Sequence, residues 1–155
     1  MNENSIINKE ISLMSDDRVS DFKGLVVDSN NVAFDQKNSK KGESPDFNRL
    51  VVIEEKYGHK YDILYLISNI QERKVRRDIE LQDLICNDQI IFVPSVDMDD
   101  FLLSKGKQGY AIISNDKFQK EIKRYPHLAN MIKNQRLSFT WIEKTKEIII
   151  PRLDL

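Results

Sequence analysis

Four short apolar runs, separated by longer amphipathic or polar stretches, constrain the fold of this chain more than any other feature. They read GLVVD, YDILYLIS, QIIFV and YAIIS, at residues 24–28, 61–68, 89–93 and 110–114. Each run is short for a helix and lacks the alternation of a strand that faces water, so it is typical of a strand covered on both faces. Because helical stretches separate the runs, the sequence predicts an α/β fold with a central, mainly parallel sheet flanked by helices.

The segments between the first three runs carry turn and helix signals. Residues 35–46 are almost all turn formers and charged residues, which predicts an exposed loop. A helix is expected from Asp46, a suitable N-cap, to Gly58, a suitable stop. A second helix should begin near Glu72 and continue to Cys86, because its apolar residues share one broad face.

The second half of the chain continues the alternation. A short helix is expected over MDDFLLSKG, and a longer helical stretch over residues 117–135 should be interrupted at Pro126. Two β-rich pieces in residues 137–151 predict a closing hairpin. Residues 1–21 lack a strand pattern and are interpreted as an N-terminal arm or short helix, which leaves residues 22–155 as the folded domain.

Composition excludes several classes of protein. With 155 residues and 40% hydrophobic content, the chain can bury a core without disulfides or a structural metal. The single cysteine, Cys86, falls in an amphipathic run, so we expect a buried thiol in a reducing compartment. His59 and His127 have no zinc-ligand spacing. The sequence has no charged n-region followed by an apolar h-region, and its apolar stretches are shorter than the roughly 18 residues that a membrane helix needs. We therefore expect a cytoplasmic protein without a membrane partner.

Charge is balanced overall, with 24 basic and 25 acidic residues, so any affinity for nucleic acid must come from local clusters. Any one such run is most often a solvated surface. The run that follows Asp116 is more informative, because at helical spacing its basic side chains lie opposite Phe118, Ile122 and Tyr125. The clusters are Lys37, Lys40 and Lys41; Arg73, Lys74, Arg76 and Arg77; and Lys117, Lys120, Lys123 and Arg124.

Aspartates stand at or just beyond the ends of three predicted strands. Asp28 ends the first run, the pair Asp99 and Asp100 follows the third, and Asp116 follows the fourth. Each alone is explained by helix capping or a turn. Because the carboxyl ends of parallel strands meet at one edge of a sheet, the set favours a site for Mg²⁺ or Mn²⁺, and such a site indicates phosphodiester chemistry.

The motifs around these aspartates resemble, in order, those of a known family. VVDSNNVAF resembles the VIDGSNVA signature of the NYN branch of PIN-like ribonucleases, in particular the Regnase-type domain associated with CCCH zinc fingers. RKVRRDIELQDLICNDQIIFVPS is similar to that family's helix and VFTPS strand, MDDF to its paired-aspartate segment, and GYAIISNDKF to its GIVVSNDNY segment. RLSFTWIEKTKEIIIP is similar to its closing YSFVNDKFMPP, so the resemblance covers residues 24–154.

The resemblance implies a PIN-like three-layer sandwich and a metal-dependent endoribonuclease. Asp28 would be the first ligand and Asp116 the last, with Asn31 positioning the ligand or the substrate. Asp99 and Asp100 would be the paired acids, and Asp100 could instead orient the attacking water. We expect substrate contacts from Ser29, Asn30, Asn115, Arg73, Lys74, Arg77, Lys117 and Lys120.

Two departures from the family bear on how RNA would be chosen. The family glycine after the first aspartate is Ser29 here, and only residues 96–98 stand where the Regnase-type domain has a longer basic loop. No CCCH spacing follows. RNA selectivity would then come from the domain itself, from a homodimer or from a regulatory protein partner.

Three other functions stay open from the sequence. One is a toxin-like PIN nuclease restrained by an antitoxin, and another is a catalytically silent domain that binds RNA or acts as a scaffold. The third is action on DNA or a nucleotide, since no residue recognisably reads the 2′-hydroxyl.

Overall fold

The fold is built on a five-stranded sheet with the strand order β3-β2-β1-β4-β5, in which every pairing is parallel. The computed structural model describes residues 22–155, and the arm expected over residues 1–21 lies outside them. The four strands predicted from the apolar runs are all present, which confirms the α/β class. The strands are β1 (Leu25–Asp28), β2 (Ile63–Ser68), β3 (Ile90–Val93), β4 (Ala111–Ile113) and β5 (Arg136–Leu137).

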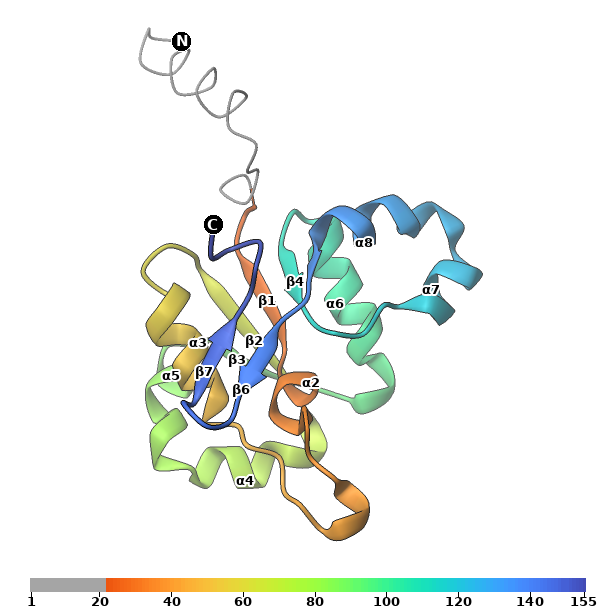
Figure 1. The fold of residues 1–155 in the computed structure, drawn as a ribbon. Helices are drawn as coiled ribbons and strands as arrows, with labels where there is room; N and C mark the ends of the chain where they lie inside the picture. Colours follow the sequence, from red (N-terminus) through yellow and green to blue (C-terminus); the bar gives the residue numbers. More distant parts are fainter. Residues whose placement is uncertain (1–21) are drawn as a thin grey trace, which may run out of the picture.

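Two layers cover the sheet (Figure 1). One consists of α6 (Met98–Lys107) and α8 (Ala129–Gln135). The other contains α3 (Arg49–Tyr57) and an antiparallel hairpin of β6 (Thr140–Ile142) and β7 (Glu147–Ile149), as the closing stretch predicted. The shorter helices are α2 (Ser29–Phe34), α4 (Glu72–Arg77), α5 (Gln82–Cys86) and α7 (Gln119–Arg124), and 3-10 turns include η3 (Asn69–Gln71), η4 (Ile79–Leu81), η5 (Ser95–Asp97) and η6 (Pro126–Leu128).

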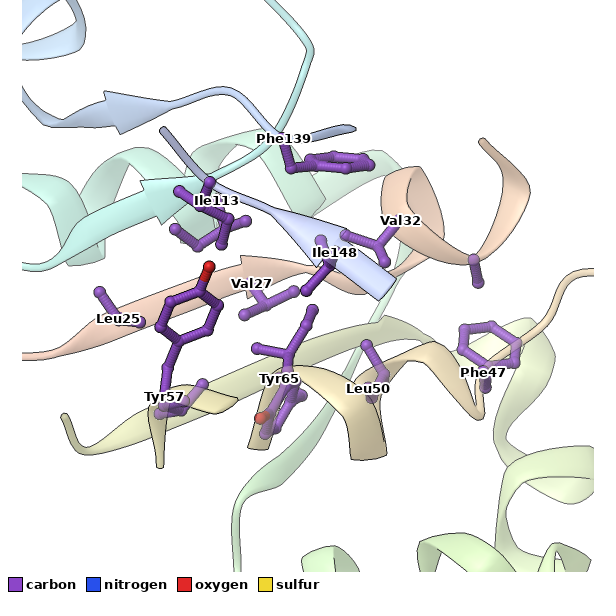
Figure 2. Packing of buried hydrophobic residues seen from close by; sticks show 14 of the residues in the cluster. Leu25, Val27, Val32, Phe47, Leu50, Tyr57, Tyr65, Ile113, Phe139 and Ile148 are labelled. Carbon is purple, nitrogen blue, oxygen red and sulfur yellow. The ribbon is translucent and has the colours of Figure 1, made fainter. Parts of the chain in front are cut away.

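The core lies on both faces of β1 because successive side chains of a strand point in opposite directions. Leu25 and Val27 join the cluster under α3 and the hairpin, whereas Val26 joins the cluster under α6 and α8. Figure 2 shows Val27 of β1 close to Ile148 of β7 within the first cluster. All of these side chains are buried, which explains why the run has no polar alternation.

The strand order reverses between β1 and β4. From β1 the chain adds β2 and β3 on one side, then returns to place β4 and β5 on the other. Connections that leave neighbouring strands in opposite directions open a crevice at their carboxyl ends, which is where α/β proteins bind ligands. Asp28 and the residues after Ile113 stand at this point.

The helix predicted from Glu72 to Cys86 is wrong as a single element. Asp78 is extended, with φ −80° and ψ 115°, and its carboxylate accepts a hydrogen bond from the Glu80 amide at 3.0 Å, which ends α4 and starts the turn η4. The apolar stripe is broken as a result: Ile79 is 85% exposed. Cys86 is also exposed, so the buried thiol predicted from the stripe is wrong as well.

Three smaller differences concern element ends. The helix expected from Asp46 begins at Arg49, and Asp46 instead accepts a hydrogen bond from the Asn48 amide. The short helix over MDDFLLSKG continues past Gly106 to Lys107. The two-residue strand β5 was not predicted, because its length gives no periodicity to detect. None of the helices in residues 22–155 has the length and apolar character that crossing a membrane requires.

One buried cation joins α2, α3 and the hairpin. The Arg49 guanidinium is 1% exposed and donates hydrogen bonds to the carbonyls of Val32 and Asp35, both at 2.9 Å. It also donates to Glu143 at 3.3 Å and lies 4.8 Å from the centre of the Trp141 ring. The side chain therefore fixes the end of α2, the helix that begins directly after Asp28.

We predict that Arg49→Met lowers the free energy of unfolding by about 2–4 kcal/mol, because the carbonyls of Val32 and Asp35 lose their buried donor. Urea denaturation followed by circular dichroism measures the change. Arg73→Met is the matched control, since Arg73 is exposed, and it should leave stability within about 0.5 kcal/mol of wild type. Equal stability of the two variants would contradict the role given to Arg49.

Candidate active site

Asp28 is held in a polar gap between the ends of β1 and β4. Its side chain is 7% exposed, and its Oδ2 accepts a hydrogen bond from the Ser114 hydroxyl at 2.8 Å. Ser114 follows β4 directly and is itself buried. The Asp28 carboxylate therefore lies where the strand order reverses, and little of it is exposed to water.

The polar residues after Asp28 attach α2 to the strands on either side of β1. The Asn30 side-chain oxygen accepts from the Ser68 amide at the end of β2, and the Asn31 oxygen accepts from the Asn115 amide after β4, both at 2.9 Å. Ser29 is buried, and its hydroxyl lies 3.4 Å from the Val27 carbonyl. These three side chains fix the position of α2 relative to β1, β2 and the segment after β4. Substrate contacts were predicted for Ser29 and Asn30, and the hydrogen bonds that the structure shows for them are within the protein.

Asn115 has a similar structural engagement. Its side-chain amide donates to the Phe139 carbonyl at 3.0 Å and accepts from the Phe139 amide at 2.9 Å. This pair of bonds ties the segment after β4 to the start of the hairpin. The Asn115 side chain is thus held by the backbone of Phe139, and the residue also lines the cleft described below, so its contact with substrate stays a prediction.

Asp116 is exposed, and it closes a tight turn before α7. Its amide donates to the Ser114 hydroxyl at 3.1 Å, and its Oδ1 accepts from the Phe118 amide at 2.8 Å. Phe118 has φ 53° although it is not glycine, and its ring is fully buried. Burial of the ring offsets the strain of the left-handed backbone. Because of this turn, α7 begins at Gln119 instead of at Lys117 as predicted.

The turn brings a fourth carboxylate to the site. Glu121 of α7 lines an open cleft of about 590 Å³ together with Asp99, from the first turn of α6, and Asp116. Glu121 was not predicted as a site residue from the sequence. A single acid among the basic residues after Asp116 was the available signal, but its direction depends on the backbone at Phe118. The remaining lining residues are Asn115, Lys117, Gln119 and Lys120.

Burial, reinforced by neighbouring negative charges, raises the pKa values of two of these carboxyl groups. Burial raises the pKa of Asp28 to about 6 against the opposing hydrogen bonds, and the Asp116 charge adds to the rise. Burial raises the pKa of Asp99 to about 7, reinforced by a hydrogen bond and charge repulsion from Glu121 and by the charges of Asp116 and Asp28. Within residues 22–155 no ion pair to Lys or Arg compensates any of the four carboxylates.

The other predicted residues divide between the cleft and its surroundings. Lys117 and Lys120 line the cleft and are exposed. Asp100 lines an adjoining pocket on the other side of Glu121. Three basic residues of α4, namely Arg73, Lys74 and Arg77, are exposed on a helix at the same end of the sheet but do not line the cleft (Figure 1).

The donor set fits a hard divalent cation, although residues 22–155 contain no preformed metal site. In the described part of the chain, no three His, Cys, Asp or Glu side chains are grouped closely enough to hold an ion between them. Mg²⁺ commonly takes only one or two carboxylates and keeps several waters, so a loose group of oxygen ligands suffices. The uncompensated charge at Asp28, Asp99, Asp116 and Glu121 is what such a cation would neutralise.

Comparison with known proteins gives a consistent result. Residues 22–151 match the family model described as the Zc3h12a-like ribonuclease NYN domain. Two solved structures of nuclear proteinaceous RNase P 2 (PRORP2) from A. thaliana are similar in fold. One has 17% identity and a TM-score of 0.64 over 95% of this chain and 34% of that chain. The other has 15% identity and a TM-score of 0.67 over 96% of this chain and 32% of that chain. This chain thus spans about a third of the length of these two structures. A search of curated proteins found no match.

We predict that Asp28→Asn stabilises the metal-free protein at pH 8 by about 1–3 kcal/mol. A carboxyl with a raised pKa in the folded state contributes stability below its unfolded pKa near 4, and that contribution is lost as the pH rises through about 6. Asparagine keeps an acceptor for Ser114 and carries no charge. Urea denaturation at pH 4.5 and pH 8 with EDTA measures the difference.

The control for this prediction is Asp83→Asn, at an exposed position on α5. Its stability should follow that of wild type at both pH values. If Asp28→Asn loses as much stability as wild type between pH 4.5 and pH 8, ionisation of Asp28 is not the cause of the loss.

Proposed function

Because this chain belongs to the family of Zc3h12a-like ribonuclease NYN domains, we propose that it is a metal-dependent endoribonuclease that hydrolyses phosphodiester bonds within RNA. One observation carries the assignment to a particular site. Carboxylates from three separate segments, at the end of β1, at the start of α6 and after β4, repel one another at the point where the strand order reverses. A fold that only bound RNA would gain nothing from this repulsion.

One or two of the carboxylates of Asp28, Asp99 and Asp116 would bind Mg²⁺ or Mn²⁺ directly, and the others would act through the waters that the cation keeps. Glu121 lies beside Asp99 in the cleft. The bound cation supplies Lewis acidity, which lowers the pKa of a water and offsets charge on the phosphate. Asn31 is a positioning residue, because its bond to the Asn115 amide sets the spacing between the Asp28 and Asp116 segments.

The RNA backbone would be held mainly by Lys117 and Lys120, because both line the cleft that contains the carboxylates. Lysine contacts to phosphates give affinity without sequence choice. Arg73, Lys74 and Arg77 of α4 would extend the basic surface along the same end of the sheet. Ser29 and Asn30 fix the positions of neighbouring backbone segments instead, given their hydrogen bonds within the protein. Asn115 makes such bonds as well, but it also lines the cleft and could contact RNA there.

We predict that wild type cuts a labelled single-stranded RNA with Mg²⁺ or Mn²⁺ and not with EDTA, leaving 5′-phosphates. Asp28→Asn and Asp116→Asn should each lower the rate by roughly 100-fold or more, because each removes a negative charge that would hold the cation. Circular dichroism checks that both variants are folded. Asp83→Asn, at an exposed residue that does not line the cleft, should cut at the wild-type rate.

The same assay separates the alternatives. A silent RNA-binding domain would cut nothing and would keep its RNA affinity in both variants. Equal cutting of a DNA oligonucleotide of the same sequence would shift the substrate class. A toxin-like nuclease would arrest growth when expressed alone, and Asp28→Asn would relieve the arrest.

We also predict that Lys120→Gln weakens binding of single-stranded RNA and reduces the slope of log affinity against log salt by about 0.7, as expected for one lost phosphate contact. Binding is measured in EDTA at salt concentrations from about 50 to about 200 mM, a range over which the salt slope can be determined. Lys133→Gln, an exposed lysine of α8, is the control with the same charge change. Identical slopes for the two variants would place the RNA elsewhere.

A further inference from the structure

A second pocket adjoins the carboxylate cleft. It has a volume of about 330 Å³ and lies between α6 and the segment that follows α7. Glu121 lines both the cleft and this pocket, so the two lie on either side of one side chain. The residues that matter for its chemistry are Asp100, Leu103, Lys107, Tyr125, His127 and Leu128.

The pocket combines an apolar floor with exposed aromatic rings. Leu103 and Leu128 are buried, at 4% and 5% exposure. Tyr125 is 43% exposed, and its ring packs edge-on against His127 with centroids 6.1 Å apart and planes at 67°. Tyr125 was expected to lie on the apolar face of its helix, yet it lies outside the buried clusters. A half-exposed ring beside an apolar floor is a surface on which a flat ligand can stack.

Polar groups stand on one wall of the pocket. Asp100 and Lys107 are seven residues apart on α6 and therefore lie on the same face, two turns from each other. One is a hydrogen-bond acceptor and the other a donor. A nucleobase has the same character, with two apolar faces and an edge that carries donors and acceptors. The volume is at the small end of ligand pockets, which range over roughly 300–1,000 Å³.

We propose that this pocket binds one nucleobase of RNA, that of the nucleotide next to the phosphate held in the carboxylate cleft. The proposal rests on the proposed function, because the shared Glu121 wall places the base beside that phosphate. A base can enter only if it is unpaired and unstacked from its neighbour. The substrate is therefore single-stranded at the cut, and Tyr125 is the stacking residue.

Cleavage mapping tests the pocket within one RNA. A single abasic ribose is placed at successive positions of a labelled single-stranded RNA, and wild type is expected to cut the bond beside each abasic site roughly 5- to 100-fold more slowly. Distant bonds in the same molecule serve as internal controls. In Tyr125→Ala all bonds should be cut more slowly and the local effect of the abasic site should disappear. Phe101→Ala, an equally exposed aromatic of α6 that does not line the pocket, should keep the wild-type pattern.

A binding experiment keeps this proposal separate from the proposed function. A trinucleotide and its fully abasic counterpart are titrated in EDTA, with NMR signals of the Tyr125 and His127 rings as the readout. The trinucleotide should shift both rings and bind roughly 5- to 100-fold more tightly than the abasic trimer, and Tyr125→Ala should remove most of that ratio.

The outcomes are decisive for each proposal. Ring shifts without any cleavage would support the pocket and overturn the nuclease assignment. Cleavage with no abasic effect, or with the same effect in Tyr125→Ala, would overturn the pocket and leave the nuclease assignment standing.

Discussion

The burial of β1 on both faces is the constraint on which the rest of the structure depends. Two hydrophobic clusters cover the strand, and β2 and β4 pair with its two edges. The residue that ends such a strand has little access to water, and here it is Asp28. The Ser114 hydroxyl donates a hydrogen bond to its carboxylate, which favours the charged form. Burial has the larger effect, and the pKa of Asp28 rises to about 6.

Polar bonds around Asp28 keep the strand ends at fixed spacing. Asn30 and Asn31 reach to the segments after β2 and β4, and Asn115 continues the connection to Phe139 in front of the hairpin. Because each side chain binds a backbone group, the network fixes main-chain positions rather than other mobile side chains. The carboxylates are consequently held near one another although their charges repel, which is a cost in stability that a cation would remove.

The sequence predicted most of the fold and three of the four carboxylates, for a physical reason. Strands covered on both faces need continuous apolar runs, and parallel strands bring their carboxyl ends to one edge, so Asp28, Asp99 and Asp116 could be grouped before the structure was known. Local interactions that periodicity does not report caused the errors. The cap at Asp78 divided one predicted helix and left Cys86 exposed. The turn at Phe118 moved the start of α7 and brought Glu121 into the cleft.

The sequence by itself determined the layers, the parallel sheet and the edge where the acids gather, because these follow from which residues must leave water. Only the tertiary structure decided which acids face the cleft and which face the neighbouring pocket. Asp99 and Asp100 are adjacent in the chain, but successive residues of a helix point about 100° apart. One therefore faces the cleft and the other the neighbouring pocket. Side-chain direction depends on where α6 packs against the sheet, and that packing is a property of the whole fold.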